Sequence, residues 1–317
     1  MIEDVLKLDG SLRCGMVVAA GSPDDLKAQA ARIEAAGLDS IWVGDHVSFH
    51  IPILESLTLL SFLAAATERV RLCTGVYLLP LRHPTLIAKI TSTLDQLAGG
   101  RLTLGVGVGG EFPPEFDAVG VPVAERGARA DEAIEILRRL WAEDRVEHHG
   151  RHFDLGPVSI DPKPLQPGGP RIVVGGRKGP TFRRAGRLGD GYISHMCSAE
   201  QYAANMKEIA GHAHAAGRDG REFETASFLF TVLDDDHDKA LDRAAKLLGM
   251  IYNRPFEDAA RKYCLLGRPE DMLEQLEGFA KAGSRHFVFS MLSDAGEFVD
   301  AFESGIRPGL SGLSLTT

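Results

Sequence analysis

The chain has 317 residues and a formal net charge of −9, with 44% hydrophobic and 25% charged residues, a composition typical of soluble globular proteins. The acidic balance argues against a nucleic-acid partner, and no apolar run approaches the length of a membrane span. The first ten residues, MIEDVLKLDG, are acidic and lack the apolar core of a signal peptide, so we expect a cytoplasmic protein.

The four cysteines, Cys14, Cys73, Cys197 and Cys264, lie far apart in the chain and form no CxxC pair. This spacing argues against a zinc site and against a disulfide framework. We expect buried, reduced thiols, with Cys73 in the core of a strand.

The first predicted elements are a strand, a helix and a second strand. Residues 12–19 (LRCGMVVA) are an apolar run, and residues 22–25 (SPDD) have the capping serine, early proline and acidic first turn of a helix start. The helix is predicted to end near Ala36, before Gly37. Residues 39–43 form the second strand, which ends in Gly44-Asp45-His46.

A helix predicted over residues 55–67 leads into the block 69–110, which has the pattern of one strand–helix–strand unit. Residues 70–79 read as a buried parallel strand, and residues 102–108 as its partner. Between them a helix is predicted over 85–97, with one apolar face made of Leu86, Ile87, Ile90, Leu94 and Leu97.

Glycines gather at the ends of both strands of this block. Gly75 interrupts the first strand, and the second ends in a run that contains Gly105, Gly107, Gly109 and Gly110. Glycine within a strand marks a bulge or a close approach of a ligand, and ligands bind at the carboxyl ends of parallel strands. The alternative is that these glycines serve only turns and packing.

Residues 111–123 are predicted to be a proline-containing loop, and residues 126–141 an amphipathic helix. Residues 145–169 break the strand–helix rhythm with short extended segments, which we interpret as an insertion. His148, His149 and His152 lie there, but no acid stands at ligand spacing, so we expect an exposed turn and no metal site.

The second half resumes the alternation. Strands are predicted at 171–176, 190–195, 224–233 and 286–291, helices at 180–188, 202–216, 239–251, 267–281 and 295–303, a loop between Tyr252 and Gly267, and a frayed tail at 309–317. The acidic run 234–236 fits a solvated helix start.

The chain thus contains about eight strand–helix pairs and no Gly/Ser linker. A single α/β domain over residues 1–317 fits best, a (β/α)8 TIM barrel with a short insertion at about 145–169. An open, doubly wound sheet is the alternative, although the dinucleotide fingerprint is absent after the first strand.

Barrel enzymes build their sites from the carboxyl ends of strands. These ends carry Asp45 and His46, Thr74-Gly75-Val76, Gly107 to Glu111, Gly175-Gly176-Arg177, and Ser194-His195. The set contains no Ser-His-Asp order and no metal cluster. It better suits a planar cofactor lying on bare backbone, with a phosphate near Gly175, Gly176 and Arg177.

Four motifs carry a resemblance over the first two-thirds of the chain: AAGLDSIWVGDHV at 35–47, the segment 64–109, EFDAVGVPVAERGARADEAIEILRRLW at 115–141, and the segment 161–193. With these motifs the chain resembles the luciferase-like monooxygenase superfamily, and within it the members that use the deazaflavin coenzyme F420. The resemblance implies a (β/α)8 barrel with an insertion, which binds a flavin or deazaflavin.

The resemblance also implies roles for individual residues. The cofactor ring would rest on a bulge at Thr74, Gly75 and Val76, with a non-proline cis peptide bond at Gly75-Val76. His46 matches a histidine that acts as an acid/base near the hydride-transfer carbon, and Asp45 is its neighbour.

Other roles follow less closely from the family pattern. Glu111 is the candidate for a carboxylic acid of related dehydrogenases, whereas Glu115 matches the general superfamily motif and has a structural interpretation. Phe49 is an approximate counterpart of an aromatic residue after the histidine. The candidate cofactor-binding residues are Asp45, Thr74, Gly75, Val76, Gly107, Gly109, Gly175, Gly176, Arg177, Ser194 and His195, the catalytic candidates are His46 and Glu111, and no metal is expected.

The leading hypothesis is an oxidoreductase that transfers a hydride between F420 and a small organic substrate. The alternatives are an FMN-dependent monooxygenase that uses reduced flavin and oxygen, and a cofactor-binding protein without turnover. The resemblance also implies a homodimer, for which the apolar helix at 56–66 is the candidate interface. We expect no nucleic-acid or membrane partner.

Overall fold

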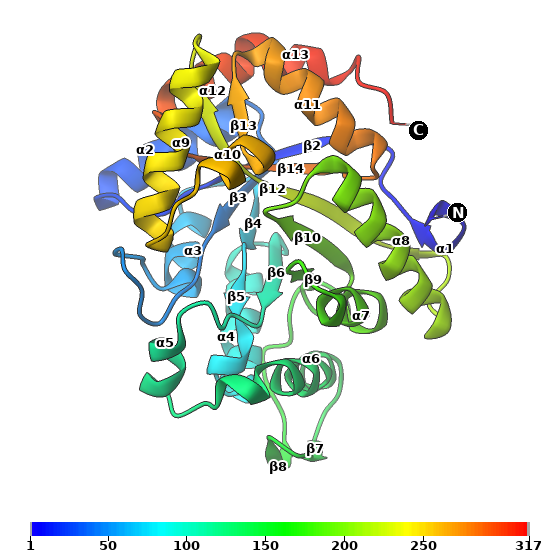
Figure 1. Ribbon diagram of the computed structural model, residues 1–317. Helices are drawn as coiled ribbons and strands as arrows, with labels where there is room; N and C mark the ends of the chain where they lie inside the picture. Colours follow the sequence, from blue (N-terminus) through cyan, green and yellow to red (C-terminus); the bar gives the residue numbers. More distant parts are fainter. Residues whose placement is uncertain (1, 316–317) are drawn as a thin grey trace.

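The computed structural model describes residues 2–315, which form a closed barrel of eight parallel strands with helices around it (Figure 1). In chain order the barrel strands are β2 (Arg13–Val17), β3 (Ser40–Val43), β4 (Arg71–Thr74), β6 (Leu102–Gly107), β9 (Arg171–Gly175), β10 (Gly191–His195), β12 (Glu224–Leu233) and β14 (His286–Met291). Each strand pairs with the next, and β14 pairs with β2. The predicted barrel is confirmed, and the open sheet is wrong, because a sheet whose last strand bonds to its first has no edge.

The outer helices are α2 (Pro23–Ala35), α3 (Ser56–Ala64), α4 (Pro84–Leu97), α6 (Arg126–Ala142), α7 (Gly179–Leu188), α8 (Ala199–Ala215), α9 (His237–Tyr252), α11 (Pro269–Lys281) and α12 (Ala295–Ala301). The start of α2 shows why this helix could be predicted from the sequence. The Ser22 hydroxyl accepts a hydrogen bond from the Asp25 amide, and the Asp25 carboxylate accepts one from the Ser22 amide. This reciprocal cap satisfies two amides that the first helical turn leaves without partners.

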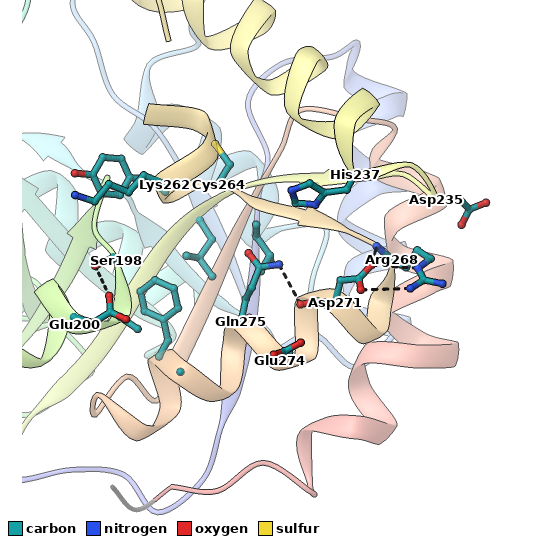
Figure 2. A pocket seen from close by; sticks show the side chains of 16 residues that line it. Ser198, Glu200, Asp235, His237, Lys262, Cys264, Arg268, Asp271, Glu274 and Gln275 are labelled. Carbon is teal, nitrogen blue, oxygen red and sulfur yellow. Dashed lines mark hydrogen bonds and ion pairs between the residues drawn. The ribbon is translucent and has the colours of Figure 1, made fainter. Parts of the chain in front are cut away.

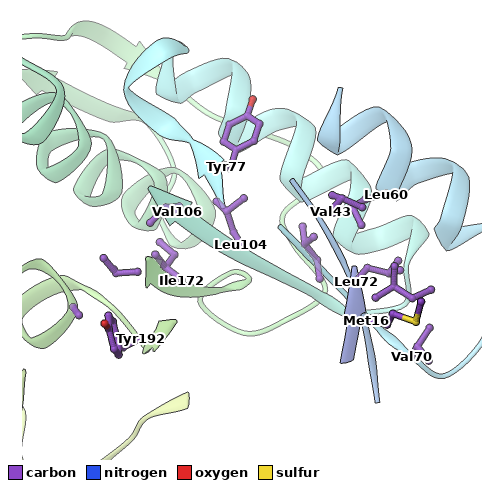
Figure 3. Packing of buried hydrophobic residues seen from close by; sticks show 14 of the residues in the cluster. Met16, Val43, Leu60, Val70, Leu72, Tyr77, Leu104, Val106, Ile172 and Tyr192 are labelled. Atoms are coloured by element: carbon purple, nitrogen blue, oxygen red, sulfur yellow. The ribbon is translucent and has the colours of Figure 1, made fainter. Parts of the chain in front are cut away.

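The strands bury two separate sets of side chains, since successive residues point to opposite faces. On β3, Ile41 and Val43 pack outward against the helices, whereas Trp42 points inward. Figure 3 shows part of the outward set, including Val43, Leu72, Leu104 and Ile172. The inward set comes from six strands and fills the barrel: Trp42, Cys73, Val173, Ile193, Ala226 and Val288.

Helix α4 differs from its predicted packing. Ile87 and Leu94 are buried, but Leu86, Ile90 and Leu97 are 64%, 43% and 70% exposed. Each helical residue turns by about 100°, so these last three lie within an arc of about 40° at one edge of the predicted apolar face. The apolar arc is wider than the face that the barrel covers, and its edge faces outward.

Two segments predicted as loops contain short elements. The 111–123 segment forms α5 (Pro113–Ala118) and the 3₁₀ turn η2 (Val123–Glu125), and the 252–267 segment forms α10 (Glu257–Tyr263) and the short strand β13 (Leu265–Gly267). Both helices are short and start next to prolines, which favoured a loop interpretation. Buried Phe116 and Ala260 hold them in place.

The segment predicted as an insertion holds a hairpin of β7 (Val146–His149) and β8 (Asp154–Val158). His149 is exposed there, as expected, but His148 and His152 pack against α6 and η2, where they contact Glu132 and Glu125. No group of three potential metal ligands occurs among residues 2–315.

The ends of the chain add short elements outside the barrel. These are α1 (Ile2–Val5), β1 (Leu6–Lys7), which pairs with β11 (Arg221–Glu222), the π turn η3 (Phe302–Ile306) and α13 (Arg307–Leu310). Of the tail predicted to fray, residues 309–315 are described, and Leu313 and Leu315 pack against the core. Residues 316 and 317 lie outside the described residues.

Candidate active site

The carboxyl ends of the eight strands meet at one end of the barrel, here called the mouth. The block predicted as a single strand at 70–79 is divided there: β4 ends at Thr74, the Gly75-Val76 peptide bond is cis, and the chain continues as β5 (Tyr77–Leu78) and η1 (Leu79–Leu81). The bulge and its cis bond were implied by the family resemblance, and the structure contains both.

The glycines around this bulge make room for it. A Cβ on Gly105 would overlap the carbonyl oxygen of Thr74, and a Cβ on Gly107 or on Gly175 would overlap the side chain of Val76. Thr74 adds a hydrogen bond from its hydroxyl to the Gly105 carbonyl at 2.7 Å. Gly107 and Gly175 therefore serve the bulge directly, by accommodating Val76, and their contact with a cofactor stays a prediction.

Asp45 anchors the loop that follows β3. Its side chain is 3% exposed and accepts hydrogen bonds from both terminal nitrogens of Arg82, at 2.6 and 2.8 Å, and from the Leu78 amide at 2.8 Å. The Ser56 hydroxyl adds a fourth contact at 3.1 Å. Asp45 was predicted to bind the cofactor, but both of its oxygens are engaged by the protein, so it ties the β3 loop to the segment after the bulge.

The neighbouring His46 is held by a buried carboxylate. Its Nδ1 lies 3.1 Å from Oε2 and 3.3 Å from Oε1 of Glu115, whose side chain is 1% exposed, while the His46 side chain is 25% exposed. The ring also stacks on Phe49, with a centroid distance of 4.0 Å and an interplanar angle of 12°. His46 thus has one protein-facing nitrogen, a fixed ring plane and access to solvent.

Further rings stand beside His46 at the mouth. His50 lies edge-on to Phe112 at 4.6 Å between centroids, and Phe112 lies edge-on to Phe49 at 5.8 Å. These rings come from the loops after β3 and β6. They give this side of the mouth an aromatic lining, which we call the His46 side.

The opposite side, here called the His195 side, is built on β10, β12 and the end of α9. His195 packs beside the rings of Phe228, Phe230 and Tyr252, and its Nε2 lies 3.3 Å from the Tyr252 hydroxyl. The pKa of His195 is lowered to about 4, mainly because the ring is buried; the charge of Glu111 acts to raise it, and those of Arg177 and Arg254 act to lower it. A histidine in these surroundings stays neutral at physiological pH.

Arg177 and Glu111, predicted for different roles, form an ion pair at 2.9 Å across the rim of the mouth. Arg177 precedes α7, a helix whose N-cap residue Lys178 makes no side-chain hydrogen bond and whose first turn has no acidic residue. An uncapped, cationic helix start is suited to an anion such as phosphate. At Gly176, a φ of 141° and the closeness of Thr181 disfavour any side chain.

The other residues predicted for the cofactor site are either buried in the protein or needed for the course of the backbone. Thr74 and Ser194 are buried, at 0% and 1% exposure, and Gly109 has a φ of 59°, a left-handed conformation that suits glycine where the strand turns into the loop. Trp42 is in the barrel core, where its Nε1 donates to the Ser40 hydroxyl at 2.8 Å.

Sequence reasoning missed three residues that shape the mouth: Glu115 as the partner of His46, Arg82 as the partner of Asp45, and Tyr252 beside His195. For Glu115, the sequence did contain a signal: the residue begins the family motif that follows the run of glycines. For Arg82 and Tyr252, partners lie 37 and 57 residues away in sequence, and only the packing of neighbouring strand–helix units brings them together.

A hollow of about 740 Å³ lies outside the barrel, between α8, α10 and α11 (Figure 2). Some of its polar groups bond to one another: Ser198 donates to Glu200 at 2.7 Å, and Arg268 pairs with Asp271 at 3.2 Å. Burial raises the pKa of the Cys264 thiol there to about 12. All four cysteines are free and buried, as predicted, and this hollow offers no activated group.

No helix within residues 2–315 combines the length and the apolar character that crossing a bilayer requires.

Comparison with known proteins gives a consistent relationship. The family model described as luciferase-like monooxygenase matches residues 11–286. An F420-dependent glucose-6-phosphate dehydrogenase of Kineococcus radiotolerans is 29% identical over 317 aligned residues, which cover 90% of this chain and 93% of that enzyme.

Two solved structures have the same fold. An F420-dependent secondary alcohol dehydrogenase superposes with a TM-score of 0.84 at 24% identity, covering 95% of this chain and 99% of that one. A long-chain alkane monooxygenase superposes with a TM-score of 0.80 at 16% identity, covering 98% and 93%. At these identities the likeness establishes the fold alone.

Proposed function

The chain belongs to the luciferase-like monooxygenase family, and from this premise we propose that it is an oxidoreductase that transfers a hydride between coenzyme F420 and a small organic substrate. The observation that carries the proposal is His46, a solvent-accessible imidazole held by a buried carboxylate on the loop next to the bulge. F420 dependence is supported by the relatives that match nearly the whole length of the chain.

The residues at the mouth fit such a cofactor. Val76 and its cis-linked neighbour Gly75 would support the ring, and the uncapped start of α7, with Gly176, Arg177 and Lys178, would hold the phosphate. When bound, the deazaflavin supplies the carbon that accepts or gives the hydride. The protein's part is to bind and orient the ring, and to move the substrate's proton.

His46 is the group proposed to move that proton. A neutral imidazole can take a proton from a substrate hydroxyl as the hydride leaves, and an imidazolium can return it in the reverse direction. Glu111 is the second proposed proton-transfer group. Because it pairs with Arg177, phosphate binding at Arg177 would loosen the pair and make the Glu111 carboxylate available at the mouth.

The substrate would enter between the His46 side and the His195 side. Rings line both, including Phe49 and Phe112 on one and Phe230 and Tyr252 on the other. This lining suits a substrate with an apolar face next to its reacting hydroxyl or carbonyl group.

The experiment that tests this function offers the protein F420 with a panel of alcohols, aldehydes and sugar phosphates, and follows the absorbance of oxidised F420. We expect substrate-dependent reduction without oxygen consumption. Oxygen uptake with reduced FMN, and no change in F420, would favour the FMN-dependent monooxygenase instead.

We also propose a homodimer, which forms through a different helix from the one that the sequence suggested. Helix α3 was the expected contact, but Leu57, Leu60 and Leu63 are buried within the chain. The exposed apolar stripe of Leu86, Ile90 and Leu97 lies on the adjacent α4 and is the better candidate. Sedimentation should show twice the chain mass of 34.2 kDa, and Leu86→Glu with Ile90→Glu should yield monomers; a wild-type monomer at micromolar concentration would refute the dimer.

A further inference from the structure

We infer that Glu115 is a positioning residue for His46: it fixes the ring with its Nδ1 proton toward the protein and its Nε2 free toward the mouth. This inference rests on the proposed function, in which His46 moves the substrate's proton, and adds the residue that sets which nitrogen does so.

The hydrogen-bond geometry determines the direction. Glu115 Oε2 faces His46 Nδ1 at 3.1 Å and the Val47 amide at 3.2 Å. An ionised carboxylate only accepts hydrogen bonds, so Nδ1 must carry the proton in this contact. In the neutral ring, Nε2 then has the lone pair, and it is the atom that can take a proton from a substrate.

Packing holds both Glu115 and the His46 ring in place. It lies on α5, whose next residue, Phe116, is fully buried in a cluster with Leu78, Leu81 and Val121. On the other side of the ring, Phe49 stacks at 4.0 Å and prevents the imidazole from turning about its bond to the chain. The carboxylate therefore sets the in-plane direction of the ring, and the stacking sets its plane.

Asp45 precedes His46 in the chain and Glu115 contacts it, but these two buried carboxylates have different partners. Both oxygens of Asp45 meet the guanidinium of Arg82, which neutralises its charge. For Glu115, the donors recorded within residues 2–315 are His46 and the Val47 amide, and no lysine or arginine pairs with it there. Among these donors His46 is the one side chain, so Glu115 can orient its ring, as in sites where a carboxylate orients a histidine for proton transfer.

The first test measures the tautomer in the protein without cofactor. Ring-nitrogen NMR of ¹⁵N-histidine-labelled protein, assigned by comparison with His46→Gln, should show the neutral His46 ring protonated at Nδ1. Glu115→Leu removes the acceptor and should shift the ring toward the Nε2-protonated form, whereas Asp117→Asn, an exposed carboxylate on the same helix, should change nothing. An Nε2-protonated ring in the wild type, or an unchanged tautomer in Glu115→Leu, would overturn the inference.

The second test uses turnover. Glu115→Leu should lower kcat by about 10- to 100-fold, in the range found when a partner that orients a histidine is removed, with F420 affinity unchanged. Combined with His46→Ala, it should cause no further loss, because Glu115 acts through His46. Additive losses would contradict this role.

If the leucine variant does not fold, Glu115→Gln replaces it in these tests. The glutamine keeps an oxygen that can accept a hydrogen bond from Nδ1, so the His46 ring should stay protonated at Nδ1. Thermal melting of each variant separates a loss of fold from a loss of orientation. A protein that fails to use F420 would refute the proposed function but leave the tautomer result standing, so the two failures are distinguishable.

Discussion

The two sides of the barrel mouth each present a histidine just at or beyond the end of a strand, in opposite surroundings. His46 contacts a buried carboxylate and is partly open to solvent, whereas His195 lies among rings near two guanidinium groups, and its pKa is lowered to about 4. The first environment gives the ring a carboxylate partner and access to solvent, and the second keeps a ring neutral. Position at a strand end is therefore not enough to assign a catalytic role; the charges around the ring decide.

Replacing His46 is expected to have the largest effect. His46→Ala should lower kcat by about 10²- to 10⁴-fold, the contribution of a positioned acid/base, while F420 affinity changes little. The matching change on the other side, His195→Gln, should reduce kcat much less, because a ring whose pKa is lowered to about 4 is a weak base at neutral pH. Steady-state kinetics of both variants on the same substrate make the comparison, with exposed His149→Ala as the control.

Near-normal turnover in His46→Ala would reverse the assignment. His46 would then only line the mouth, and Glu111 would become the first candidate to test.

The charge next to the His195 side can be removed at Arg177. Arg177→Ala should raise the dissociation constant of F420 by about 10-fold, as expected when a charge-assisted hydrogen bond to phosphate is lost. Fluorescence titration measures this, with Arg187→Ala, an exposed arginine at the far end of α7, as the control. An unchanged affinity would show that Arg177 stays with Glu111 and does not meet the phosphate.

The smallest expected effect is on acid stability. His195 has a folded-state pKa of about 4, below the ordinary value of 6.5, so between these pH values the unfolded chain binds more protons than the folded one. Its contribution is fully present above pH 6.5 and is lost as the pH falls toward 4. His286, with a pKa lowered to about 3 mainly by burial, acts with the same sign.

Melting curves check this directly. Between pH 6.5 and 4, His195→Gln should lose less stability than the wild type, by a difference on the order of 1 kcal/mol. Parallel losses in the two proteins would mean that His195 has the same pKa in the folded and the unfolded chain, and the contrast with His46 would fail.

Much of the fold could be predicted from local signals. Apolar runs, the Ser22 cap and the prolines and glycines at element ends marked most barrel strands and helices, because each signal acts within a few residues. Helix α4 shows the limit: periodicity placed Leu86 and Ile87 on one apolar face, but only the packed barrel shows which edge of that face remains exposed.

The candidate site was harder to predict than the fold, because its contacts also depend on how the barrel packs. Strand ends gave His46 and His195, but their difference depends on Glu115 and Tyr252, which reach them across 69 and 57 residues of chain. The glycines at 107 and 175 suggested room for a ligand, and in the structure Val76 of the bulge packs beside both of them. Such contacts depend on the register of strands around the barrel, which local sequence patterns do not specify.

The proposed cofactor can be tested most directly by titrating the wild-type protein in parallel with F420 and with FMN and following the quenching of protein fluorescence. The bulge at Val76 and the uncapped start of α7 lead us to expect a micromolar or lower dissociation constant for F420 and weaker binding of FMN. Tight binding of FMN with no response to F420 would contradict the account.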